Sequence, residues 1–86
     1  MEKSKYVMGV DKSLGKDYQA VSILNVKTKT VEASVIRPTL VESLYEISLQ
    51  MKKKGIAIDR DTLDFHNRKM RYTDDITGET GEIDII

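Results

Sequence analysis

The segment 39–54 constrains the fold most, because several independent helix signals coincide in it. Thr39 precedes Glu42 by three positions, which is a capping-box pattern, and Pro38 brings the chain in extended. Lysines fill the last turn, and Gly55 follows as a stop. The apolar residues at helical spacing are Leu40, Leu44, Ile47 and Met51, and Val41 and Tyr45 are expected to widen the same stripe. The pattern predicts a helix over about 39–54 whose apolar face covers a sheet.

Three β-strands are predicted before this helix. They cover Tyr6–Val10, which ends in Asp11, then Tyr18–Val26, and then Val31–Ile36. In the third segment, Val31, Ala33 and Val35 alternate with polar residues, so these three are expected on a buried face. Short connections, at residues 12–17 and 27–30, predict a three-stranded antiparallel meander.

The chain after Gly55 gives weaker signals. A short strand is predicted over Ile56–Ile58, a turn over Asp59–Asp61, and a C-terminal β-hairpin around the two glycines of Thr77–Gly81. The apolar residues Ile83, Ile85 and Ile86 are expected to pair into a sheet or to lie at an interface. The fold prediction is a single α+β domain, residues 1–86, with one helix over a meander, then a short strand and a C-terminal hairpin.

Composition narrows the class of protein. Of the 86 residues, 40% are hydrophobic and 33% are charged, which is typical of a globular domain rather than a disordered chain. There is no cysteine, which excludes disulfides and thiolate zinc sites. No apolar run is long enough for a signal peptide or a membrane span, so a cytoplasmic location without membrane association is expected. The net charge of zero argues against broad nucleic-acid binding.

One stretch suggests a specific chemistry. Residues 7–20 read Val-Met-Gly-Val-Asp-Lys-Ser-Leu-Gly-Lys-Asp-Tyr-Gln-Ala. This stretch resembles the first strand and turn of RNase H-like folds, most closely the nuclease domain of phage terminase large subunits. The resemblance implies that Asp11 and Asp59 are metal-binding carboxylates at adjacent strand ends, holding Mg²⁺ or Mn²⁺ that activates water against a phosphodiester. Because the family also uses further acids on later elements, an inactive remnant is an alternative.

A second acidic group offers metal ligands of another kind. Asp59, Asp61, Asp64 and His66 supply carboxylate oxygens and one imidazole. The spacing does not fit an EF-hand, which needs glycine and glutamate where Asp64 and Met70 stand. In a strand, Asp64 and His66 would share a face and form half of a metal site. The alternative is a solvated turn.

Basic residues cluster twice. The run Lys52–Lys54 is explained by the helix C-terminus, whereas Arg68, Lys69 and Arg71 with Tyr72 are candidates for phosphate contacts and base stacking. Protection of an exposed strand edge is the alternative explanation for the arginines.

These patterns favour a small binding or assembly protein without catalytic activity or cofactor. It is expected to act on a protein partner or to self-associate, as a homodimer joined through sheet edges. The terminase-like stretch suggests a phage or prophage accessory protein. The alternatives are a metal-dependent nuclease or its remnant, with Asp11 and Asp59, and a nucleic-acid-binding module.

Overall fold

The computed structural model describes residues 5–11 and 18–86, so the predicted turn at 12–17 lies outside the described residues. The described chain forms six strands and one helix. In chain order they are β1 (Tyr6–Asp11), β2 (Gln19–Asn25), β3 (Thr30–Arg37), α1 (Leu40–Lys52), β4 (Ile56–Asp64), β5 (Lys69–Asp74) and β6 (Thr80–Ile85). This is a small α+β domain, as the sequence predicts.

All six strands join in one mixed sheet with the order β3-β2-β1-β6-β5-β4. The predicted meander is one half of it, with β1–β2 and β2–β3 antiparallel. The other half, β4–β5–β6, is also antiparallel, and the halves meet where β1 and β6 run parallel. The predicted hairpin is present as β5–β6. The strand after the helix is longer than predicted, and Asp59–Asp61 lies within β4 instead of forming a turn.

The helix begins and ends where its sequence signals indicate. The Oγ1 atom of Thr39 accepts a hydrogen bond from the backbone N–H of Glu42 at 3.1 Å, which satisfies one free donor of the first turn. Gly55 adopts φ of +83°, a left-handed conformation that costs glycine little. The chain then enters β4.

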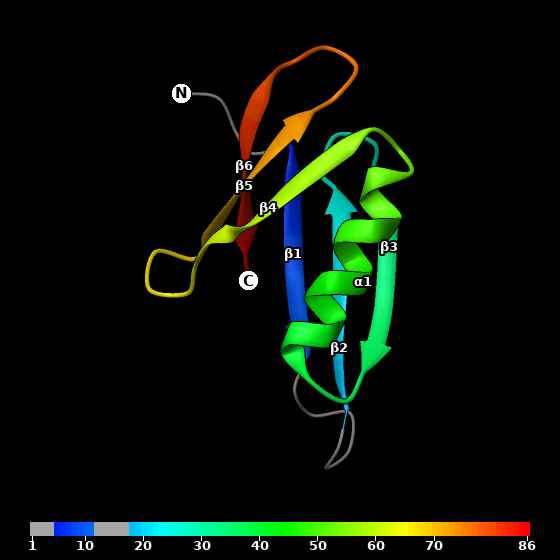
Figure 1. Ribbon diagram of the computed structural model, residues 1–86, viewed down its shortest axis with the longest axis vertical. Coiled ribbons are helices and arrows are strands. Elements are labelled where there is room, and N and C mark those ends of the chain that lie inside the picture. Colours follow the sequence, from blue (N-terminus) through cyan, green and yellow to red (C-terminus); the bar gives the residue numbers. More distant parts are fainter. Residues whose placement is uncertain (1–4, 12–17) are drawn as a thin grey trace.

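The sheet curls toward the helix. Figure 1 shows α1 in front of β2 and β3, with β4 crossing obliquely beside it. The helix contacts β2 and β3 near one edge and also β4, the strand at the opposite edge. Side chains from both halves of the sheet therefore share one core, whose fully buried members include Met8, Val21, Ile23, Ile47, Met51, Met70 and Ile83.

A β-bulge changes the predicted face of β3. Ile23 pairs with Ala33 and Leu24 pairs with Val31, so Glu32 is an extra residue in β3 without a partner on β2. The alternation shifts by one position there. Val31 is 59% exposed as a result, whereas Ala33 is buried as predicted.

The apolar C-terminal segment lies in the middle of the sheet. β6 is flanked by β1 and β5, and Ile83 and Ile85 are buried. The backbone N–H of Ile86 donates to the carbonyl oxygen of Met8 at 2.9 Å, although its side chain is exposed. The prediction that this segment pairs into a sheet is confirmed.

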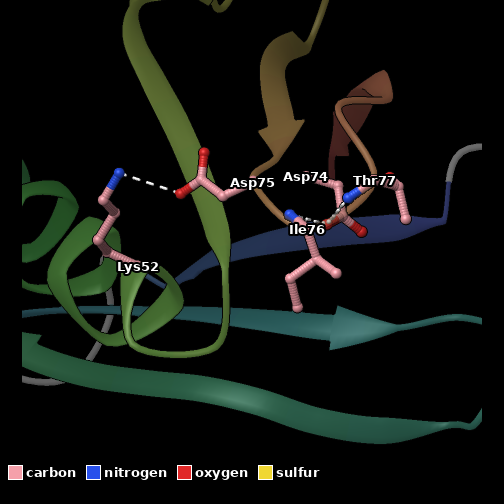
Figure 2. A network of polar contacts seen from close by, with 5 residues as sticks. All are labelled: Lys52, Asp74, Asp75, Ile76 and Thr77. Carbon is pink, nitrogen blue, oxygen red and sulfur yellow. Dashed lines mark hydrogen bonds and ion pairs between the residues drawn. The ribbon is translucent and has the colours of Figure 1, made fainter.

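Three hairpin loops share one design. Each begins with an Asn or Asp whose Oδ1 accepts the backbone N–H groups two and three residues later, and a residue with positive φ follows one position further on. The first residues are Asn25, Asp64 and Asp74, and the left-handed residues are Lys29, Arg68 and Gly78. Figure 2 shows the third loop, where Asp74 faces the N–H groups of Ile76 and Thr77. Asx side chains thus position the turns of the sheet.

Candidate protein-binding surface

The two carboxylates suggested as metal ligands lie on different parts of the sheet. Asp11 ends β1 and Asp59 lies in β4, with β6 and β5 between these strands. Three interstrand spacings amount to about 14 Å along the sheet. The Oδ1 atom of Asp59 accepts a hydrogen bond from the N–H of Asp61 at 3.2 Å. Within residues 5–11 and 18–86, no group of three or more acidic, histidine or cysteine side chains gathers around a possible metal position.

Asp64 and His66 do not share a strand face, which corrects the prediction of half a metal site. Asp64 ends β4, and its Oδ1 accepts the N–H groups of His66 and Asn67 at 2.9 and 3.1 Å. The N–H of Asn67 lowers the pKa of Asp64 most, followed by the Asn67 side-chain amide, which donates to Oδ2. Asp64 is therefore a turn-forming residue whose hydrogen bonds favour its ionised form.

The basic residues of β5 are surrounded by acids. Arg71 stands opposite Asp59 on β4 and opposite Glu82 on β6. The ammonium group of Lys69 lies 3.5 Å from the Glu82 carboxylate. Arg68 sits in the adjoining turn with φ of +57°. Because acids lie on both neighbouring strands, this face has no net basic character that would attract phosphates.

Tyr72, which the sequence suggests as a stacking residue, is buried. Its ring packs edge-to-face on Tyr6, with 5.2 Å between the ring centroids, and it covers Gly81 on β6. Burial, and then the neighbouring Tyr6, raises the pKa of Tyr72. The ring is part of the core and is not available to a nucleobase.

The helix exposes apolar side chains that the sequence pattern assigned to the core. Val41 is 73% exposed and Tyr45 48%, while Ser43 is fully buried. At 100° per residue, Val41 and Tyr45 lie about 90–130° from the centre of the buried stripe, and Ser43 lies closer to it. The Ser43 hydroxyl donates to the carbonyl oxygen of Gln19 at 3.2 Å, which makes its burial possible.

Leu49 continues this exposed stripe. It is 42% exposed and lies one turn beyond Tyr45. We call Val41, Tyr45 and Leu49 the helix surface. A surface hollow of about 360 Å³ adjoins its first half and is lined by Arg37, Val41, Glu42, Tyr45, Glu46 and Arg60.

Two arginines from the sheet frame this hollow. The guanidinium carbon of Arg60, on β4, lies 5.1 Å from the centroid of the Tyr45 ring. From the other side, Arg37 approaches the Glu46 carboxylate at 3.9 Å. An apolar centre with a charged rim is typical of a protein-binding surface. Neither Leu49 nor Arg60 was a sequence candidate, because the contact between β4 and the helix is not visible in the sequence.

Both edges of the sheet carry features that oppose pairing with another strand. On β3, Lys54 Nζ donates to the carbonyl oxygen of Glu32 at 2.6 Å, and Arg37 donates to its neighbour Ile36 at 2.8 Å. On β4, the pairing with β5 is irregular between Asp59 and Asp64, where the exposed charged residues lie. Occupied carbonyl groups, bulges and charges are common protections of edge strands. The predicted dimer through sheet edges therefore faces obstacles at both edges.

Comparison with protein-family models, with curated proteins and with solved structures found no significant match. In the part of the chain that the structure describes, no helix has the length and apolar character needed to cross a membrane.

Proposed function

We propose that this protein is a small, non-catalytic binding or assembly protein that recognises a protein partner through the helix surface. The observation that carries the proposal is the exposed row of Val41, Tyr45 and Leu49 beside a hollow with a charged rim. Scattered exposed apolar residues are normal, but a row at four-residue spacing on one helix is typical of helix-mediated recognition. The phage or prophage origin suggested by residues 7–20 is part of this proposal.

The polar clusters support the alternatives less well. The carboxylates of Asp64 and Asp74 accept backbone hydrogen bonds in turns, and that of Asp59 accepts one within β4. The cations of β5 stand opposite acids. These groups thus have structural roles in the fold. DNA cleavage in Mg²⁺ or Mn²⁺ that disappears in Asp11→Asn would overturn the proposal in favour of a nuclease.

Site-specific photo-crosslinking tests the binding surface directly. A benzophenone amino acid replaces Tyr45 in one variant and Phe65 in a matched control, since Phe65 is equally exposed, at 49%, in the turn between β4 and β5. We expect ultraviolet irradiation in cells to give discrete protein adducts from position 45 and only diffuse background from position 65. Equal adducts from both positions, or none from position 45, would contradict the proposed surface.

A further inference from the structure

We infer that the occupant of the helix surface is a second copy of this chain, whose α1 packs antiparallel against the first. This inference rests on the proposed function, because it names the partner for the same surface. It would make the protein a weak homodimer with a helix–helix interface.

The exposed row has the spacing that such packing requires. Val41, Tyr45 and Leu49 recur every four residues and form a ridge of the kind that packs into the groove of a facing helix. In an antiparallel pair related by a two-fold axis near position 47, Tyr45 of each copy lies level with Leu49 of the other. Ser48, beside the axis, is small, and its hydroxyl already donates to the carbonyl oxygen of Tyr45 at 2.6 Å. The two helices could therefore approach closely at Ser48, because its hydroxyl keeps this acceptor within its own helix.

The charges along the helix are complementary to those of an antiparallel copy. Glu42 and Glu46 lie in the first half, whereas Lys52, Lys53 and Lys54 lie at the end. Glu42 and Lys53 are eleven positions apart, which is about three turns, so they lie on one flank of the row. Antiparallel packing brings Glu42 of each copy toward Lys53 of the other, while parallel packing would place like charges together. The two helix dipoles also oppose each other in this arrangement.

The rest of the molecule favours this face for self-association. Lys54 and Arg37, which donate to carbonyl groups of β3, and the irregular pairing of β4 oppose contact through the sheet edges. The net charge of zero leaves no overall repulsion between copies. One helix face is a small interface, so we expect a dissociation constant of about 10–500 µM rather than a permanent dimer.

Sedimentation equilibrium of the full chain between about 5 µM and 1 mM tests the inference. We expect the wild type to dimerise and Leu49→Lys to raise the dissociation constant about tenfold or more, because the interface would bury a lysine without a partner. Phe65→Lys is the matched control, because it places the same charge at an apolar position of similar exposure outside the helix, 49% against 42% for Leu49. It should leave dimerisation unchanged. Circular dichroism melting confirms that each variant is folded.

A charge-reversal pair tests the antiparallel arrangement. Glu42→Lys and Lys53→Glu should each weaken self-association about threefold to tenfold, and an equimolar mixture of the two should recover it, because each Glu42–Lys53 contact then joins opposite charges. A wild type that is monomeric at 1 mM, dimerisation unaffected by Leu49→Lys, or a mixture without recovery would each overturn the inference. If the wild type is monomeric but position 45 crosslinks a different protein, the proposed function stands and only the second copy is wrong.

Discussion

Gly81 is fixed by a neighbouring aromatic ring and not by its own backbone conformation. A Cβ atom at this position would lie 2.7 Å from atoms of the Tyr72 ring, which is packed against Tyr6 and cannot move away freely. Gly9, also in a strand, has room, since its nearest neighbour would be Ser22 Oγ at 3.5 Å. The two glycines form a matched pair for measuring the effect of this contact.

We expect Gly81→Ala to lower the free energy of unfolding by about 1–3 kcal/mol through overpacking. Gly9→Ala should be neutral or stabilising by up to about 1 kcal/mol, because alanine loses less backbone freedom on folding. Urea unfolding of both variants makes the comparison. Equal effects of the two substitutions would show that the Tyr72 ring does not restrict position 81.

Asp64 links turn formation to pH. Hydrogen bonds from Asn67 and His66 lower its pKa below the ordinary value of 3.8. A depressed pKa in the folded state contributes stability that is present above the unfolded pKa and is lost as pH falls through the folded one. Asp64→Asn keeps the acceptor oxygen for the two backbone N–H groups, removes the charge, and replaces the oxygen that accepts the Asn67 side-chain amide.

We therefore expect the difference in unfolding free energy between wild type and Asp64→Asn to be constant near neutral pH. The difference should shrink below about pH 4, where the unfolded chain becomes protonated first. Chemical unfolding across pH 2–7 measures it. A difference that does not change down to pH 2 would mean that the hydrogen bonds do not favour the ionised carboxylate.

At the scale of elements, the hairpin loops share an Asx residue, and its contribution can be measured. Asp74 Oδ1 accepts the N–H groups of Ile76 and Thr77 at 2.9 and 3.2 Å (Figure 2). We expect Asp74→Ala to cost about 1 kcal/mol, which corresponds to a loss of roughly 4–8 °C in melting temperature for a domain of this size. Asp74→Asn, which retains the acceptor oxygen, should stay close to wild type. If both variants lose the same stability, the charge of Asp74 matters more than its hydrogen bonds.

The helix illustrates what its own sequence could and could not specify. Thr39 and Gly55 fixed its limits because caps act within one turn. The helix sequence does not specify which border residues belong to the buried face, since Val41 and Ser43 lie on either side of the apolar stripe. Hydrophobicity alone predicts that Val41 is the buried one. Ser43 is buried instead, because β2 lies below the helix and the carbonyl of Gln19 accepts the Ser43 hydroxyl. Residues at the border of an apolar stripe are assigned by tertiary contacts, which leave Val41 exposed as part of the proposed helix surface.

At the scale of the whole molecule, the order of the strands in the sheet could not be predicted from the sequence. Local patterns located most of the strands, including β1, β3 and the β5–β6 hairpin. No local pattern indicates that β6 lies between β1 and β5, because the β1–β6 pairing joins the two ends of the described chain. The separation of Asp11 from Asp59 follows from this order. The bulge at Glu32 was equally invisible, since it depends on the register with β2.

Because β6 joins the two halves of the sheet, a destabilising substitution in β6 should lower the stability of both halves. Ile83 is fully buried and stands opposite Tyr6 and Met70 on its two neighbouring strands. We expect Ile83→Ala to cost about 2–5 kcal/mol. Amide hydrogen exchange should then accelerate in β2 as well as in β5, since the halves share one core. Acceleration confined to β4–β6 would show that the first meander is stable by itself.

The central place of β6 also has a consequence during synthesis on the ribosome. Translation delivers β6 after the other five strands, yet β1 needs it to cover one side of Tyr6 and Met8. Until β6 arrives, β1 has an unpaired edge, although it is an interior strand of the finished sheet. The two halves of the sheet therefore cannot join until β6 has left the exit tunnel, and β1 keeps this edge unpaired throughout that interval.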